Sequence, residues 1–433
     1  MPPVRPPAVL RGVSAALRRS GRAGEGFSAA WSGTRGPSAR ALAAGRGPRG
    51  AAPPRHPAHA RLPVAPLGIE RLALHPAPAA FSPGSVPIVY HPAYSAPRLV
   101  TPSGQPHRFP MQVFGALFRQ LVASGVAQPG ATFVPERLPT REMLLLAHCP
   151  GYVDALADGT LPADKVRRIG FHGAVFSDAL LERSLAEVAG TLLTARLALR
   201  FGLACHVAGG THHAHFDAGS GFCVLNDFAV AVRTLQRTGE ARRVAILDLD
   251  VHQGDGNAAL FHGDPSVLTV SVHAQSNFPY RKSPGDLDIG LPDGAGDDEL
   301  LAAARRALGA VREFAPDLVF YDAGVDVHAA DALGRLRVTD AGLARRESLV
   351  LDSLLAQGLP VCAHVGGGYD ADLEVLAARH AVLHAAAGEM WRDYGLGAPR
   401  AGAAPGAVPR PVGSWSGIQA WEGLDMFGAE RAA

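Results

Sequence analysis

Two acids and a histidine alternate in the segment Asp248-Leu249-Asp250-Val251-His252. Side chains of an extended chain alternate between its two faces, so Asp248, Asp250 and His252 should share one face and lie close together. Two unpaired carboxylates in an apolar sheet would cost free energy, and a bound cation removes that cost. The spacing therefore predicts a metal site.

Another carboxylate, Asp326, comes after the apolar run 318–321, with Gly324 and Val325 directly before it. Asp250, His252 and Asp326 would give three ligands and leave a fourth position for water, as in catalytic zinc sites. Zinc held there would polarise a carbonyl group and lower the pKa of water. A single Asp at a strand end is commonly a helix N-cap, but that role does not explain three acids and a histidine together.

The run from Gly209 to Phe216 contains the adjacent pair His212 and His213. On its own, a histidine-rich run is equally consistent with a simple metal-binding tract. Asp248 and Asp255 are not needed as metal ligands and would orient the two imidazoles. A histidine hydrogen-bonded to a carboxylate is fixed in one tautomer and made more basic, as a general base requires.

Three glycines precede Tyr369 in the segment Val365-Gly366-Gly367-Gly368-Tyr369. Glycines allow the backbone to approach a ligand closely, and a phenol beside a metal can stabilise an oxyanion. The alternative is a flexible turn followed by a packed aromatic residue.

The elements that position these residues alternate along the chain after Val86. The predicted strands are 244–251, 267–273, 318–321 and 360–364, and the predicted helices are 228–236, 297–314, 339–357 and 373–388. Continuous apolar strands separated by helices indicate an α/β fold with a parallel sheet covered on both faces. Ligands of such sheets bind beyond the carboxyl ends of the strands, where the polar residues above are found.

The charge is divided unevenly along the chain. Residues 1–85 contain 12 Arg, no Lys and two acids, a net charge of +10, whereas the whole chain carries +2 and the remainder therefore −8. With 14 Pro and 11 Gly, this first segment is predicted to be a disordered basic extension, and its composition also suits a transit peptide. We expect a folded body over residues 86–395 and a low-complexity tail over 396–433.

Composition also excludes several classes of protein. An acidic body disfavours direct nucleic-acid binding, and no uncharged apolar run reaches the length of about 18 residues that a membrane span requires. The four cysteines form no C-x-x-C pair, which favours a soluble protein of a reducing compartment over a disulfide framework. That compartment would be the chloroplast or mitochondrion if the source is eukaryotic and the extension is a transit peptide, and otherwise the cytoplasm or nucleus.

Taken together, the motifs resemble those of the zinc-dependent histone deacetylase family and its bacterial relatives, the acetoin-utilisation proteins and acetylpolyamine amidohydrolases. They occur in the order GGTHHA, GSGFCVLND, DLDVHQGDG, TVSVH, GVD and GGGY between about Tyr90 and Trp391. Gln253 and the segment 277–301 are most similar to class IV and to bacterial deacetylase and acetoin-utilisation-like members. The resemblance implies an arginase/deacetylase-like three-layer α/β/α fold with a largely parallel eight-stranded sheet.

The same resemblance assigns roles to individual residues. It implies that Asp250, His252 and Asp326 bind zinc, and that Tyr369 hydrogen-bonds the substrate carbonyl. His213, backed by Asp255, would be the general base and acid, and His212, backed by Asp248, its electrostatic partner, although which histidine moves the proton stays open. Gly221, Phe222, Gly367 and Gly368 would line the substrate channel with Phe278 opposite. A structural potassium ion would be held by Asp248, Ser271 and Val272.

The expected activity is hydrolysis of acetyl-lysine, or another acyl-lysine, in histones or other proteins. An amidohydrolase acting on acetylpolyamines or other small acetylated amines is the alternative, and a catalytically inactive scaffold that binds acyl-lysine is a third hypothesis. Arginase-like chemistry with two manganese ions is disfavoured, because the ligand order here is D-x-D-x-H. The acidic body would suit substrates with lysine-bearing segments or polyamines.

Overall fold

The computed structural model describes residues 82–95, 107–171, 178–400 and 409–415. Within these ranges eight strands, all paired in parallel, form one sheet in the order β2-β1-β3-β8-β7-β4-β5-β6. The strands are β1 (Ile88–Val89), β2 (Thr132–Phe133), β3 (Leu203–His206), β4 (Val244–Asp248), β5 (Val267–Ala274), β6 (Leu287–Leu291), β7 (Leu318–Asp322) and β8 (Val361–His364). The α/β class with a parallel eight-stranded sheet is therefore confirmed.

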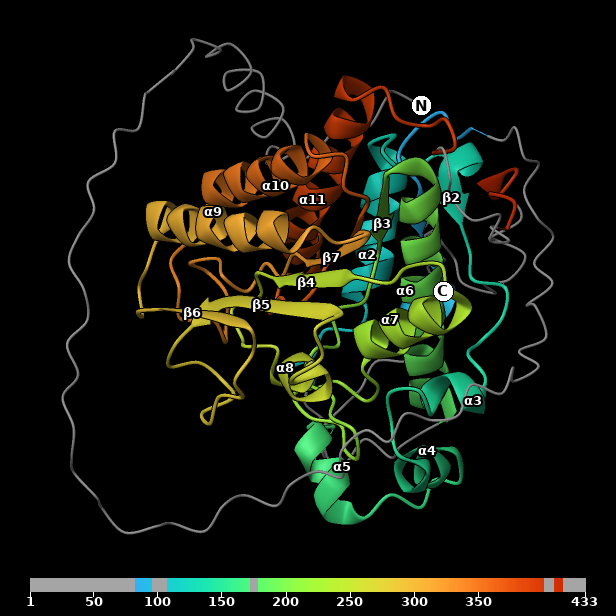
Figure 1. Cartoon of the computed structure of the whole chain (residues 1–433), viewed down its shortest axis with the longest axis vertical. Coiled ribbons are helices and arrows are strands. Elements are labelled where there is room, and N and C mark those ends of the chain that lie inside the picture. The colour runs from blue at the N-terminus through green and yellow to red at the C-terminus, as the bar shows by residue number, and fades with distance from the viewer. Residues whose placement is uncertain (1–81, 96–106, 172–177, 401–408, 416–433) are drawn as a thin grey trace, which may run out of the picture.

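Helices cover both faces of this sheet and produce three layers (Figure 1). The helices are α2 (Val113–Ala123), α3 (Arg141–Leu144), α4 (Pro150–Ala157), α5 (Ala163–Ile169), α6 (Asp178–Phe201), α7 (Asp227–Thr238), α8 (Asp255–Phe261), α9 (Asp297–Phe314), α10 (Asp340–Leu355) and α11 (Leu373–Asp393), with short 3₁₀ turns η1 (Pro92–Ser95) and η2 (Pro129–Ala131). Helices α9, α10 and α11 pack side by side over one face, and α6 and α7 pack together against the other. Every residue of the central strands β4, β7 and β8 is buried between these layers, which explains their unbroken apolar sequences.

The predicted strands and helices agree with the observed ones, with one informative difference. The sequence predicts a strand through Val251, but β4 ends at Asp248. The backbone N–H of Asp250 bonds to Oδ1 of Asp248 at 3.0 Å instead of continuing the sheet ladder. Asp250 and His252 consequently lie on a loop beyond the strand.

The strand register places four polar side chains in one row at the carboxyl edge of the sheet. Ser271 of β5 is paired with Asp248 of β4, Asp248 with Asp322 of β7, and Asp322 with His364 of β8. Neighbouring residues in register point to the same face of a parallel sheet. A buried polar row therefore lies where the loops of the site converge.

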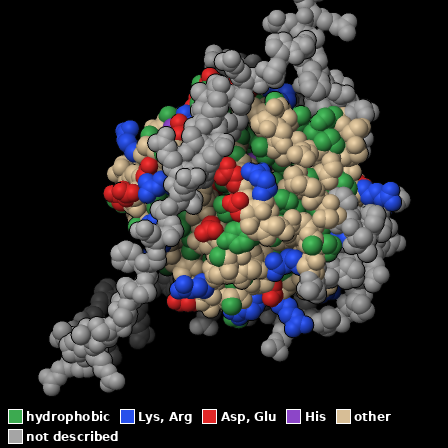
Figure 2. Space-filling model, turned by 90° about the horizontal axis from the view of Figure 1, so that it is seen from above, with side chains coloured by type: hydrophobic (Ala, Val, Ile, Leu, Met, Phe, Trp, Pro, Cys, Tyr) green, Lys and Arg blue, Asp and Glu red, His purple; other side chains and the backbone are tan. Residues whose placement is uncertain are grey.

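The described part of the C-terminal tail packs against the body. The Val412 N–H bonds to the Thr132 carbonyl oxygen at 2.8 Å, and the ring of Trp415 lies 5.8 Å from that of Phe118. The predicted basic extension lies outside the described residues apart from its last few positions. On the face shown in Figure 2, acidic and basic side chains are interspersed and hydrophobic ones are scattered. Among the described residues, no helix is both long and apolar enough to cross a membrane.

Candidate active site

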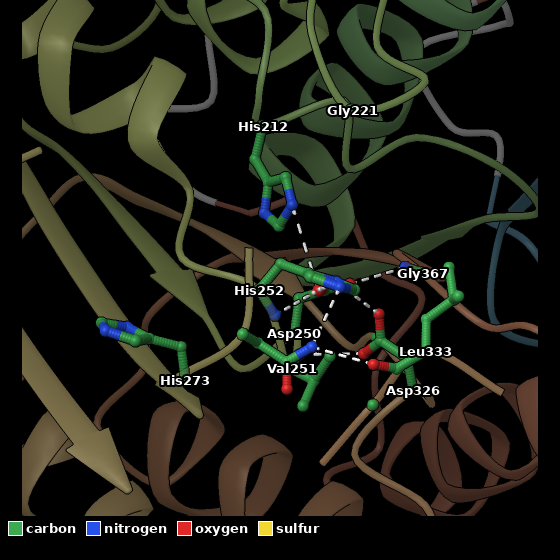
Figure 3. A network of polar contacts seen from close by, with 12 residues as sticks. His212, Gly221, Asp250, Val251, His252, His273, Asp326, Leu333 and Gly367 are labelled. Carbon is green, nitrogen blue, oxygen red and sulfur yellow. Dashed lines mark hydrogen bonds and ion pairs between the residues drawn. The ribbon is translucent and has the colours of Figure 1, made fainter. Parts of the chain in front are cut away.

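The three predicted metal ligands converge in the structure although they come from two separate loops. Nδ1 of His252 lies 3.1 Å from Oδ1 of Asp250 and 3.1 Å from Oδ2 of Asp326. All three side chains are buried, and one ligand atom from each lies within 4.8 Å of the others. Figure 3 shows them facing one another with Gly367 alongside.

Backbone N–H groups fix the two carboxylates in place. Val251 donates to Oδ1 of Asp326 at 2.8 Å, and Gly367 donates to Oδ2 of Asp250 at 2.7 Å. A Cβ atom on Gly367 would lie 2.3 Å from Oδ2 of Asp326, so only glycine fits there. Gly367 thus supports the ligands as well as lining the cavity beside them.

A buried arginine that sequence reasoning missed joins the two ligand loops. Arg346 on α10 donates to the carbonyl oxygens of Leu249 at 3.2 Å and Gly324 at 2.7 Å. Its charge is compensated by Glu347, 2.6 Å away. Leu249 precedes Asp250 and Gly324 lies two residues before Asp326, so Arg346 sets the separation of the two loops. Its only signal in the sequence is an Arg-Glu pair within an otherwise ordinary helix.

The pKa shifts in the ligand trio, Asp250, His252 and Asp326, are those expected of a site that binds a cation. Burial, together with the neighbouring carboxylate of Asp250, raises the pKa of Asp326 to about 7. Burial opposes a charge on His252, but hydrogen bonds to Asp250 and Asp326 outweigh it and raise the pKa of His252 to about 10. Two carboxylates and an imidazole in one buried cluster compete for protons, and a divalent cation would satisfy all three at once. The donor set of two oxygens and one nitrogen fits zinc.

The tandem histidines lie next to this trio, each backed by the predicted aspartate. Nδ1 of His212 is 2.8 Å from Oδ2 of Asp248, and Nδ1 of His213 is 2.6 Å from Oδ1 of Asp255. The two Nε2 atoms are 3.2 Å apart. Burial opposes a charge on His212, but Asp248 and Asp250 outweigh it and raise the pKa of His212 well above its ordinary value. Burial and the adjacent His212 lower the pKa of His213 to about 4, which leaves His213 neutral and able to accept a proton.

His215, whose role was not predicted, completes the support of this pair. Its Nε2 lies 3.0 Å from Oδ2 of Asp255, so Asp255 is held between two histidines. The loop that carries them is anchored by Asp227, which accepts hydrogen bonds from the backbone and hydroxyl of Thr211 at 2.9 and 2.6 Å. The H-H-x-H spacing and the Asn-Asp pair of GSGFCVLND are the signals that indicate these contacts.

Tyr369 closes one side of the site. Its ring centroid is 6.2 Å from that of His252, and its backbone N–H bonds to Oδ2 of Asp331 at 2.7 Å. Burial, with the nearby carboxylates, raises the pKa of Tyr369 well above its ordinary value. The phenol is therefore a hydrogen-bond donor at neutral pH.

Three of the predicted channel residues, Gly221, Phe222 and Phe278, line a cavity of about 520 Å³ that leads to the site, and Gly367 lines the inner cavity described below. Gly221 has φ +53°, and a Cβ there would lie 2.5 Å from Cδ2 of His213. The Phe278 ring is 4.9 Å from the imidazole of His213, and the Phe222 ring is 6.1 Å from the ring of Tyr369. Gly368 lines neither this cavity nor the inner one, because it lies against Val325 and His380.

An inner cavity of about 40 Å³ extends past the metal ligands. Phe109, Phe114 and Glu187 are among the residues that line it. Glu187 is buried and bonded to Arg183 at 2.9 Å, and it also accepts a hydrogen bond from the backbone N–H of Gly209 at 3.2 Å. A buried ion pair therefore forms part of the wall of the inner cavity.

A further buried acid, Asp322, was also missed. Neither of its carboxylate oxygens has a hydrogen-bond partner among the described residues, and Oδ2 lies 3.7 Å from Nδ1 of His212. The sequence YDAGVD contains the acid four residues before Asp326, which is the signal that could have identified it. Asp248 pairs with Asp322 on one side and with Ser271 of β5 on the other. Asp248 and Ser271, two of the three residues predicted to hold potassium, are therefore neighbours.

Comparisons with known proteins agree with this geometry. Residues 107–385 match the histone deacetylase domain. An uncharacterized protein of Picosynechococcus is 50% identical over 306 residues, which cover 70% of this chain and 99% of that protein. Histone deacetylase 2 of Arabidopsis thaliana is 28% identical, covering 61% of this chain and 70% of its own. The acetoin utilization protein AcuC of Bacillus subtilis is 33% identical, covering 48% and 58%.

Solved structures share the fold. A histone deacetylase homologue complexed with SAHA has a TM-score of 0.58 and 25% identity, covering 72% of this chain and 84% of its own. The acetylpolyamine aminohydrolase of Burkholderia pseudomallei has a TM-score of 0.57 and 23% identity, covering 71% and 99%, which shows the fold alone. With the domain match spanning well over half of its length, this chain belongs to the histone deacetylase family.

Proposed function

We propose that this chain is a zinc-dependent deacetylase that hydrolyses the amide of an acetyl-lysine side chain in a protein. The observation that carries the proposal is the convergence of three sets of groups in one buried pocket: the ligand trio, the carboxylate-backed histidine pair and the Tyr369 phenol. A module that only binds acyl-lysine has no use for the complete set. A second buried group, His212, Asp248 and Asp322, lies close by, but His212 and Asp248 are bonded to each other at 2.8 Å. Together with the ligand order D-x-D-x-H, this favours one zinc ion over a two-manganese centre.

Asp250, His252 and Asp326 would hold the zinc ion. When bound, zinc supplies a Lewis acid that polarises the acyl carbonyl and makes water more acidic. Asp248 and Ser271, with the backbone carbonyl of Val272, would hold a structural potassium ion.

The proton is moved by His213 in this proposal. Asp255 holds the Nδ1–H of His213, so Nε2 presents its lone pair and accepts a proton from the attacking water. The charged His212, fixed by Asp248, stabilises negative charge that develops nearby. Tyr369 donates a hydrogen bond to the acyl oxygen. The new C–O bond forms, the C–N bond breaks as His213 returns the proton to the amine, and lysine and acetate result.

The inner cavity favours an acetyl group over longer acyl groups. Its volume of about 40 Å³ has room for roughly three water-sized groups, which matches the three heavy atoms of an acetyl group. A longer chain would press against Glu187, which lines this cavity and forms a buried ion pair with Arg183, and breaking a buried ion pair is costly.

Hydrolysis of acetyl-lysine peptides by the zinc-loaded protein tests the proposal. We expect hydroxamate-sensitive release of acetate, with acetyl hydrolysed faster than butyryl or longer groups on the same peptide. The double substitution Asp250→Ala and Asp326→Ala should abolish zinc binding, measured by metal analysis. Folded, zinc-loaded protein that binds these peptides without hydrolysing them would instead identify a scaffold, and faster turnover of an acetylpolyamine would identify a small-molecule amidohydrolase.

A further inference from the structure

The mouth of the channel is lined by arginines. The cavity of about 520 Å³ that leads to the site is bordered by Arg108, Arg168 and Arg335. Among the described residues that line it there is no aspartate or glutamate. This local charge is opposite in sign to the acidic net charge of the folded body.

Most of this positive charge is not neutralised by neighbouring acids. Arg335 pairs with Asp293 at 3.3 Å. Arg108 and Arg168 are exposed, and in the described parts of the chain neither forms an ion pair with an acid. The segments 96–106 and 172–177, which the structure does not describe, contain no acidic residue.

The neighbouring surface does not supply the missing negative charge. A second cavity, of about 710 Å³, shares His107 and Arg108 with the mouth. The acid that lines it, Asp370, pairs with Arg379 at 2.6 Å. Arg108 thus borders both cavities, Arg168 borders the one that leads to the site, and both side chains are exposed.

Residues next to Arg108 and Arg168 in the sequence form hydrogen bonds with the channel wall. Arg168 lies in the last turn of α5, and the carbonyl oxygen of the following Ile169 accepts the N–H of Phe222 at 2.7 Å. Nε2 of His107, the neighbour of Arg108, lies 3.0 Å from the carbonyl oxygen of Gly170. The backbone segments that carry the two arginines are thus joined to the same part of the channel wall, beside Ile169 and Gly170.

We propose that this arginine-lined mouth, formed by Arg108, Arg168 and Arg335, selects an acetyl-lysine flanked by acidic residues of a protein. The proposal rests on the proposed deacetylase function and specifies its substrate class. Acidic side chains beside the acetyl-lysine would lie within a Debye length, about 8–10 Å at physiological salt, of Arg108 and Arg168 and be attracted to them. Lysine-rich segments and polyamines would be repelled.

The test compares three peptides that differ only in the residues around one acetyl-lysine: two glutamates, two glycines or two lysines on each side. We expect kcat/KM of the zinc-loaded enzyme to be on the order of tenfold higher for the glutamate peptide than for the lysine peptide, through KM, and the ratio to shrink in high salt. The double variant Arg108→Gln, Arg168→Gln should reduce this ratio roughly fivefold or more. The double variant Arg305→Gln, Arg306→Gln removes the same charge from an exposed part of α9 and should leave the ratio unchanged.

Two results would overturn the proposal: preference for the lysine peptide or an acetylpolyamine, or a ratio that the Arg108 and Arg168 substitutions do not alter. The dissociation constants of fluorescently labelled peptides provide a readout that does not depend on turnover. If the glycine peptide is not hydrolysed, the deacetylase function fails, but the charge preference is still measured by binding. If it is hydrolysed without a charge preference in either readout, only the selectivity proposal fails.

Discussion

The proposed division of roles between His212 and His213 rests on their different surroundings. Both imidazoles are buried and both contact a carboxylate, yet His212 lies near Asp248, Asp250 and Asp322 whereas His213 faces Asp255 and the neighbouring imidazole. The pKa values of the two histidines are consequently shifted in opposite directions. A pair of titratable groups with separated pKa values is the usual arrangement for acid and base roles.

Tyr369 provides the sharpest test at the scale of a single residue. Substitution of Tyr369 by Phe should lower kcat on an acetyl-lysine peptide on the order of 100-fold, because an oxyanion donor is lost. Zinc content and thermal stability should stay unchanged, since the contact that fixes this residue to Asp331 is made by its backbone N–H. Wild-type kcat in the Phe variant would show that the phenol does not act on the reacting carbonyl.

At the scale of elements, the predicted metal ligands depend on three loops that meet at the carboxyl edge of the sheet. The loop after β4 carries Asp250, the loop after β7 carries Asp326, and the loop after β8 supplies the N–H of Gly367. Arg346 of helix α10 donates hydrogen bonds to the backbone of the first two of these loops. The ligand spacing is thus maintained by an element that contributes no ligand.

Removing that connection should affect both folding and metal binding. Arg346→Met leaves Glu347 without its cation, bonded to the Tyr321 hydroxyl alone, and removes the donor to three buried carbonyl groups. We therefore expect a loss of about 3–5 kcal/mol in the free energy of unfolding. Zinc affinity should fall roughly 10-fold to 100-fold, as when other supports of metal ligands are removed. Urea unfolding and zinc competition measure the two effects.

Arg345→Met is the matched control on the same helix. Arg345 is 54% exposed and pairs with Asp298 at 3.4 Å, so its loss should change stability by no more than about 0.5 kcal/mol. Unchanged zinc affinity in a folded Arg346→Met variant would contradict the positioning role.

At the scale of the whole molecule, the interior contains many neutral histidines. His148 accepts a hydrogen bond from the N–H of Asn226 at 3.0 Å and contacts the His215 carbonyl oxygen at 3.0 Å, which requires one neutral tautomer. Burial lowers the pKa of His148 to about 4. Burial likewise lowers the pKa of His364 and His384 to about 4 and of His380 to about 3.

These pKa values predict a loss of stability in acid. Between about pH 6.5 and pH 4 the unfolded chain binds protons at these histidines and the folded chain does not, so stability is complete above pH 6.5 and falls as the pH is lowered. Each such histidine contributes roughly 2–3 kcal/mol to this loss. Thermal unfolding from pH 7.5 to 4.5 should show the decline, and His148→Gln should make it less steep. A melting temperature independent of pH over this range would refute the expectation.

The sequence alone predicted those strands and helices that have a regular pattern of buried residues. Helix α9 begins and ends at the predicted residues, 297 and 314. Strands β7 and β8 coincide with apolar runs because they are buried along their whole length, and β5, which has one half-buried residue, was also predicted. The two-residue strands β1 and β2 are too short to leave a pattern. At the sheet edge, β6 mixes buried and exposed residues and has no continuous apolar run.

The same division holds for the site. The ligand types, the histidine pair and Tyr369 could be recognised from local spacing, although Asp250 and His252 lie on a loop and not on the predicted extension of β4. Asp322, Arg346 and the arginines of the mouth acquire their roles only from register and from loops that meet across the fold. A side chain's burial, and the charge it faces, are set by residues distant in the chain. The sequence by itself therefore determined which residue types could do chemistry, and the tertiary structure decided which buried and charged groups surround them.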